Sequence, residues 1–222
     1  MANYKKGIEM RQHIIREARM VFNDEGLHLT LDQLAGKLNL TKGRITNYFP
    51  TKDDLFVALS KDYDIRFQEL TAQFGGERKV SFEWLVKVFS AVMDLQYQYR
   101  SAIIFVATTS SSQKEMHNQI TKSFKTNSKQ VSQSVESLLN AGLVKPVILD
   151  PKVFEVFCFQ YVNLFTTWVI SLEIYNSSSS YKKMKPVYLK GIFGCFYPYL
   201  TKKGLGQYRL ILNQEKNNFL TH

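Results

Sequence analysis

The sequence predicts an all-α protein with a small N-terminal helical domain followed by a larger helical domain. Apolar residues recur at helical spacing nearly everywhere, and no sustained alternating stretch has a hairpin turn between its halves. With 222 residues, of which 45% are apolar, the chain can bury one large core or two smaller ones. We place the boundary after residue 54, which gives domains at 1–54 and 55–222.

The N-terminal part carries local signals for three helices. An apolar stripe predicts a first helix that ends at Gly26, a residue that takes the left-handed conformation at low cost. Thr30 and the glutamine three residues later have the spacing of a capping box, so a second helix begins there. Asn39 tolerates the positive φ that the following turn needs. Thr41 then caps a short third helix, which Pro50 ends.

Five further helices follow, and glycine, proline and serine mark the breaks between them. Their approximate ranges are 52–74, 81–106, 113–141, 151–175 and 185–200. Pro151 and Pro186 mark helix starts, because proline in a first turn loses no hydrogen bond. The stretch 156–172 has no charged residue, but polar residues interrupt it and Glu155 and Glu173 bound it. We therefore expect a helix buried on nearly every side rather than a membrane span.

Two short helices joined by Asn39-Leu40, the second polar and basic, form the pattern of a helix-turn-helix. The segment reads Thr30-Leu-x-x-Leu-Ala-x-x-Leu-Asn-Leu-Thr-Lys-Gly-Arg-Ile-Thr-Asn-Tyr-Phe-Pro-Thr-Lys-Asp-Asp-Leu55. It resembles the DNA-binding motif of the TetR/AcrR regulators over about residues 10–60. Asn39 stands where that family usually has glycine, and Thr46 stands where an aromatic residue is common.

The resemblance implies a homodimer that binds double-stranded operator DNA and carries a helical ligand-sensing domain. It assigns phosphate contacts to Thr30, Tyr48 and Lys52, and base-edge contacts to Lys42, Gly43 and Arg44. Independently of the family, an arginine near the front of a recognition helix matches guanine O6 and N7, and a glycine beside it permits close approach. The predicted DNA-binding residues are Thr30, Thr41, Lys42, Gly43, Arg44, Thr46, Asn47, Tyr48 and Lys52.

The overall charge does not identify the partner by itself. The formal net charge is +10, which favours a partner with negative charge. Residues 1–60 hold nine Lys or Arg and seven Asp or Glu, a net charge of only +2. The placement of individual basic side chains must therefore create the DNA footprint, while the basic remainder favours nonspecific attraction.

Large aromatic residues are frequent in the C-terminal part, and aromatic side chains with a few polar anchors are typical of a pocket for a small apolar ligand. Polar residues inside the helix predicted over 151–175 point the same way, because they need hydrogen-bond partners when buried. Ordinary core packing is the alternative for each ring. The predicted pocket residues are Trp84, Phe89, Phe105, Phe157, Gln160, Tyr161, Asn163, Phe165 and Trp168.

The last predicted helix is a candidate for the subunit interface. Gly191 and Gly194 let another backbone approach closely, and Phe193 and Phe196 lie on the same helix. These four residues, together with the helix at 151–175, are the predicted interface. Flexibility near Pro198 is the alternative explanation of the two glycines.

No pattern in the sequence favours catalysis or a bound metal. The four histidines lack metal-ligand spacing, no glycine-rich phosphate loop precedes a helix, and no serine or cysteine has an evident paired base. We expect no enzyme, no cofactor and no metal. Cys158 and Cys195 are too few for a disulfide framework, and no secretion signal is evident, so we expect a cytoplasmic protein.

The function predicted from the sequence is transcriptional repression, with release from the operator by a small apolar or amphipathic ligand. Two alternatives stay open. One is a helix-turn-helix regulator that responds to a protein partner or to cysteine oxidation. The other is a helical lipid-binding protein or enzyme in which the N-terminal motif is only a scaffold.

Overall fold

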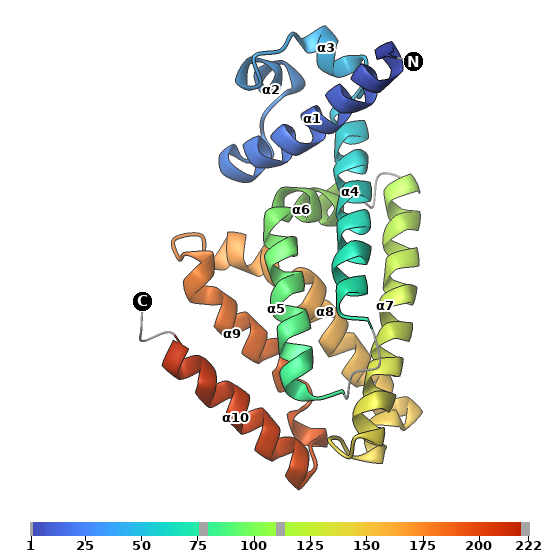
Figure 1. Cartoon of the computed structure of the whole chain (residues 1–222), viewed down its shortest axis with the longest axis vertical. Helices are drawn as coiled ribbons and strands as arrows, with labels where there is room; N and C mark the ends of the chain where they lie inside the picture. The colour runs from blue at the N-terminus through green and yellow to red at the C-terminus, as the bar shows by residue number, and fades with distance from the viewer. Residues whose placement is uncertain (1, 76–79, 110–113, 219–222) are drawn as a thin grey trace. The chain divides into compact units, whose positions relative to one another are not determined.

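The computed structural model describes residues 2–75, 80–109 and 114–218, and the regular elements in this part of the chain are helices (Figure 1). The prediction of an all-α fold is confirmed. The α-helices are α1 (Ala2–Glu25), α2 (Leu31–Lys37), α3 (Lys42–Thr46), α4 (Lys52–Gln73), α5 (Phe82–Gln98), α6 (Arg100–Thr109), α7 (Lys114–Asn140), α8 (Pro151–Tyr175), α9 (Tyr181–Gly194) and α10 (Lys202–Asn218). Two short 3₁₀ helices, η2 (Pro146–Leu149) and η3 (Tyr197–Tyr199), complete the set.

The helices form two compact units. The first unit comprises Met1–Leu70 and Asp94–His117, and the second comprises Thr71–Met93 and Asn118–His222. The first unit is therefore discontinuous in sequence, because α6 and the end of α5 join the N-terminal helices. The functional boundary that we place after residue 54 stays a prediction.

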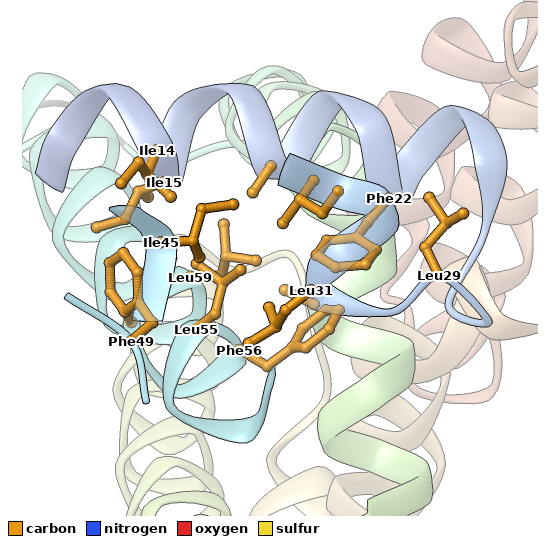
Figure 2. Close-up of a cluster of buried hydrophobic side chains, with 14 of the residues drawn as sticks. Ile14, Ile15, Phe22, Leu29, Leu31, Ile45, Phe49, Leu55, Phe56 and Leu59 are labelled. Carbon is orange, nitrogen blue, oxygen red and sulfur yellow. The ribbon is translucent and has the colours of Figure 1, made fainter. Parts of the chain in front are cut away.

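A single hydrophobic cluster holds the first unit together (Figure 2). Ile14 and Phe22 of α1 are buried on the side of α1 that faces α3 and α4, as helical spacing requires. Ile45 of α3 is 0% exposed. Phe56 of α4 stacks on Phe105 of α6, with ring centroids 3.9 Å apart. Full burial of one such side chain contributes roughly 1.5–3 kcal/mol, so this cluster fixes α3 against its neighbours.

The break between α5 and α6 depends on a residue of α1. Asn23 Nδ2 donates to the Gln98 carbonyl at 2.7 Å, and Asn23 Oδ1 accepts from the Ser101 amide at 3.1 Å. Arg100 Nη2 donates to the Asn23 carbonyl at 2.7 Å. The sequence predicts one helix over 81–106, and this prediction is wrong. The cap comes from a side chain 75 or more positions earlier in the chain, where local periodicity cannot reveal it.

The structure also corrects the predicted start of the last helix at Lys185-Pro186. α9 begins at Tyr181, so Pro186 lies inside the helix. Ser180 is the N-cap, and its side chain accepts from the Lys183 amide at 3.3 Å. An N-cap hydrogen bond of this kind stabilises a helix by about 1 kcal/mol, which favours the earlier start.

α10 is a further helix that the sequence prediction missed. Two glycines, Gly204 and Gly206, lower the helix propensity of this segment. Thr201 nevertheless caps it, because its hydroxyl accepts from the Gly204 amide at 3.0 Å. A Cβ at Gly204 would lie only 1.9 Å from the Leu143 carbonyl oxygen. This glycine is therefore needed for the close approach of two backbones.

Candidate nucleic-acid interface

The helix-turn-helix is built from the local signals that the sequence carries. The Thr30 hydroxyl accepts from the Gln33 amide at 3.2 Å, and the Thr30 amide donates to Gln33 Oε1 at 2.9 Å. Asn39 takes a φ of +52° in the turn. The Thr41 hydroxyl accepts from the Arg44 amide at 3.2 Å and so begins α3. The capping box, the turn and the N-cap of the third helix are all confirmed.

α3 exposes most of its side chains. Only Ile45 is buried in this five-residue helix, and Lys42, Gly43 and Arg44 are exposed. A Cβ at Gly43 would meet no atom within 4 Å. Packing within the chain therefore does not require glycine at this position.

The residues flanking α3 differ in how freely they can meet a partner. Thr30, Thr41 and Asn47 are exposed, while Thr46 is half-buried. The Thr46 hydroxyl donates to the Gly43 carbonyl at 3.3 Å, so this side chain bonds back to its own helix.

The residues that follow α3 pack against the first half of α1. Phe49 is buried, and the Arg11 guanidinium lies 5.1 Å from the centroid of its ring. Tyr48 is half-buried, and its hydroxyl lies 3.9 Å from the position that a Cβ at Gly7 would occupy. The first turns of α1 therefore lie beside the predicted phosphate contact at Tyr48.

Lys52 differs from the other predicted contacts because its ammonium group is engaged inside the protein. Lys52 Nζ donates to the Leu27 carbonyl and lies 5.5 Å from the ring centroid of Phe22 and 6.0 Å from that of Phe56. Burial lowers the pKa of Lys52, and the neighbouring Asp53 opposes that shift. Lys52 thus ties the start of α4 to the segment between α1 and α2. Its phosphate contact stays a prediction, and that contact would compete with the Leu27 carbonyl.

A polar network that the sequence prediction missed joins α1 and α4 to Tyr99, the residue between α5 and α6. The Tyr99 hydroxyl donates to Asp62 of α4, and the Arg19 guanidinium of α1 lies 4.6 Å from the centroid of the Tyr99 ring. Burial and the Asp62 carboxylate raise the pKa of Tyr99 to about 12. The phenol therefore keeps its proton at neutral pH and can act as a donor. Contacts between residues 37 positions apart leave no local signal.

Known proteins share both the motif and the fold of this chain. Residues 14–59 match the family model of the bacterial regulatory proteins of the tetR family. The helix-turn-helix segment of this chain is therefore similar to the TetR family. Regulators of this family are DNA-binding proteins rather than enzymes. No curated protein sequence matches the chain significantly.

Three solved structures illustrate the shared TetR fold. A TetR-family transcriptional regulator from Marinobacter aquaeolei VT8 is 17% identical with a TM-score of 0.77, covering 93% of this chain and 97% of that chain. A gamma-butyrolactone receptor, described as an ArpA-like protein, is 15% identical with a TM-score of 0.67, covering 96% and 99%. The SmeT–triclosan complex is 13% identical with a TM-score of 0.60, covering 87% and 93%. SmeT is described as the repressor of the Stenotrophomonas maltophilia multidrug efflux pump SmeDEF.

Four of the predicted pocket residues form an aromatic cluster in the second unit. The ring centroid of Tyr161 lies 5.7 Å from that of Phe89, 5.5 Å from that of Phe157 and 6.2 Å from that of Phe165. Burial raises the pKa of Tyr161 well above its usual value. Trp84 Nε1 is buried and has no hydrogen-bond partner within the described residues. We call Phe89, Phe157, Tyr161 and Phe165 the aromatic cluster.

The other aromatic residues predicted at the pocket or the subunit interface pack against other partners. Trp168 lies 5.7 Å from the ring centroid of Tyr181, and Phe105 packs in the first unit. Phe193 and Phe196, which the sequence predicts at a subunit interface, are each 2% exposed. Phe193 lies 5.2 Å from Phe89 and Phe196 lies 5.0 Å from Phe157, centroid to centroid. Both therefore extend the aromatic cluster and offer little surface to a partner.

Within the single chain, α8 is not buried on nearly every side. Phe159 is 65% exposed, and Val156, Gln160 and Asn163 are exposed as well. Asn163 Nδ2 donates to the Phe159 carbonyl of its own helix at 2.7 Å. Gln160 and Asn163 therefore do not need a ligand to satisfy them. α8 is long and apolar enough to cross a membrane, but core helices of soluble proteins pass the same test.

Proposed function

We propose that this chain is a dimeric repressor that reads a two-fold operator with α3. The observation that carries the proposal is a five-residue helix that buries one side chain and exposes Lys42, Gly43 and Arg44. So short a helix adds little to the core, whereas helix-turn-helix proteins place such a helix in the major groove. Its N-cap at Thr41 and its anchor at Ile45 hold the exposed face in a fixed orientation.

The exposed side chains suit different parts of the DNA. Arg44 carries a planar fork that matches guanine O6 and N7, and we propose that it reads a base. Lys42 and Gly43 lie beside it, the first as a donor and the second as a point of close approach. Thr30 and Tyr48 lie at the edges of the surface and are proposed to bind phosphates, which fix register without reading sequence.

A dimer is required because one short recognition helix reads few bases. We propose that α8 and α9 supply the surface for a second copy of the chain. Val156, Phe159 and Leu164 give α8 an exposed apolar face. α9 packs against α8, and a Cβ at Gly191 or Gly194 would meet no atom within 4 Å.

We further propose that a small apolar or amphipathic ligand binds at the aromatic cluster of this cytoplasmic regulator. The rings of Phe89, Tyr161 and Phe165 provide the apolar surface. Solved proteins with this fold include a gamma-butyrolactone receptor and a complex with triclosan. The ligand releases DNA if it prefers the conformation that DNA does not bind, and operator must then weaken the ligand by the same factor.

Cysteine oxidation is less well supported as the signal. Cys158 is buried. Burial raises the pKa of the Cys195 thiol, which lowers the fraction of reactive thiolate at neutral pH.

Selection of bound sequences from random double-stranded DNA tests the proposal directly. The wild-type protein should enrich a two-fold consensus. Arg44→Ala should relax one position in each half-site, at a cost of roughly 1–3 kcal/mol in discrimination. Arg209→Ala, which removes an exposed arginine of α10, is the matched control and should leave the consensus unchanged. If the wild type enriches no sequence at moderate salt, the chain does not read DNA.

A further inference from the structure

The positive charge of the N-terminal segment gathers in the first half of α1. Residues 2–16 hold four basic residues and one acidic residue, a net charge of +3. Residues 17–60, which contain the helix-turn-helix, hold five basic and six acidic residues, a net charge of −1. A segment with a net negative charge does not attract a polyanion by its overall charge. Within residues 1–60, the net positive charge that attracts DNA therefore lies in residues 2–16.

Two of these four basic side chains are already engaged. The Arg11 guanidinium lies over the ring of Phe49, and Arg16 Nε forms an ion pair with Glu17 Oε1 at 3.0 Å. Lys5 and Lys6 are exposed, and within the described residues neither forms an ion pair. Their charges are therefore available to a partner.

The position of Lys5 and Lys6 relates them to the predicted DNA surface. They directly precede Gly7, whose Cβ would lie 3.9 Å from the Tyr48 hydroxyl at the end of α3. The first fully buried residue of α1 among those described is Ile14, and Met10 packs against the core cluster, so residues 2–9 extend about two helical turns beyond it. This extension runs beside the end of the recognition helix (Figure 1).

We propose that Lys5 and Lys6 form a second DNA contact, which binds phosphates flanking the bases that α3 reads. The inference rests on the proposed function. An ammonium group on a flexible stem is a point charge with three donors, which suits a phosphate better than a defined base edge. The two lysines anchor the protein on DNA of any sequence and leave selectivity to Arg44.

The test compares two matched lysine pairs in the full-length protein. Lys5→Gln/Lys6→Gln removes the proposed contact. Lys182→Gln/Lys183→Gln removes an exposed pair that also follows a tyrosine, in the first turn of α9 in the second unit. Fluorescence anisotropy measures the affinity for the selected operator duplex between about 50 and 200 mM salt.

The slope of log K against log salt should fall by about 1.8 per subunit in Lys5→Gln/Lys6→Gln, because each lost phosphate contact contributes about 0.9. Lys5→Gln alone should give about half of that change. The consensus sequence and the unfolding midpoint should not move, since both side chains are exposed. The Lys182→Gln/Lys183→Gln slope should equal that of the wild type.

Three results would overturn the inference. An unchanged slope in the Lys5→Gln/Lys6→Gln variant shows that the lysines do not meet phosphates. An equal fall of the salt slope in both double variants shows a general effect of net charge. An altered consensus shows base readout instead of anchoring. If the wild type binds no selected duplex, the result contradicts the proposed function itself and not only this inference.

Discussion

Replacing Gly43 with alanine should raise stability and weaken operator binding at the same time. In the free chain a Cβ at this position meets no atom within 4 Å, and the residue lies in α3. Alanine is favoured over glycine in a helix by about 0.5–1 kcal/mol. We expect the unfolding free energy to rise by up to that amount, which corresponds to about 2–4 °C in Tm for each kcal/mol at this chain length.

In the proposed complex with DNA, the same methyl group would occupy the space through which the backbone approaches the bases. If the added bulk moves Arg44 out of reach, one bidentate contact worth roughly 1–3 kcal/mol is lost from each recognition helix. That loss corresponds to roughly a five- to 150-fold weaker interaction per helix. Stability and binding therefore change in opposite directions, which a general folding defect cannot produce.

Urea denaturation and anisotropy with the selected operator measure the two effects separately. Gly206→Ala is the control, because a Cβ there also meets no atom within 4 Å and the residue lies in α10 of the second unit. It should gain stability and keep its affinity. Operator binding that is unchanged in Gly43→Ala would refute the role of this glycine in close approach. A fall in stability would refute the view that α3 has open space at this position.

Three further changes probe other parts of the molecule. Lys52→Met removes the bond to the Leu27 carbonyl and should lower the unfolding free energy by about 1–3 kcal/mol. If Lys52 also meets a phosphate as predicted, the salt slope of DNA binding falls by about 0.9 per subunit, and an unchanged slope would contradict that contact. Gly204→Ala should destabilise by roughly 1–3 kcal/mol or more in thermal unfolding, since its Cβ would clash with the Leu143 carbonyl, and an unaltered Tm contradicts that packing. Phe159→Glu should give a monomer in analytical ultracentrifugation and weak operator binding in anisotropy. A dimer with wild-type affinity for the operator would exclude α8 from the interface.

The helix-turn-helix could be predicted because its signals are local. Thr30 caps a helix by bonding to a residue three positions later, and Asn39 needs only its own backbone conformation to make the turn. The exposed face of α3 follows from its composition, since Ile45 is its only large apolar side chain. Each of these features can be inferred from a few consecutive residues.

Features that depend on distant residues could not be predicted in this way. The corner between α5 and α6 depends on Asn23, which lies 75 positions before its partner Gln98. The internal bond of Lys52 joins residues 25 positions apart. The orientation of α8 escaped prediction for another reason. Apolar residues occur all round this helix, so their spacing does not indicate which face is exposed.

The discontinuity of the first unit limits how its DNA-binding part can be moved between proteins. A fragment that ends near residue 60 contains the predicted DNA-contacting side chains, but it leaves Phe56 without the ring of Phe105 and Asn23 without its two backbone partners. An uncovered apolar patch of this kind favours aggregation. A chimaeric regulator that inherits this operator specificity must therefore carry residues 94–109 together with the N-terminal helices. In recombination between related genes, two separate segments would have to be exchanged together.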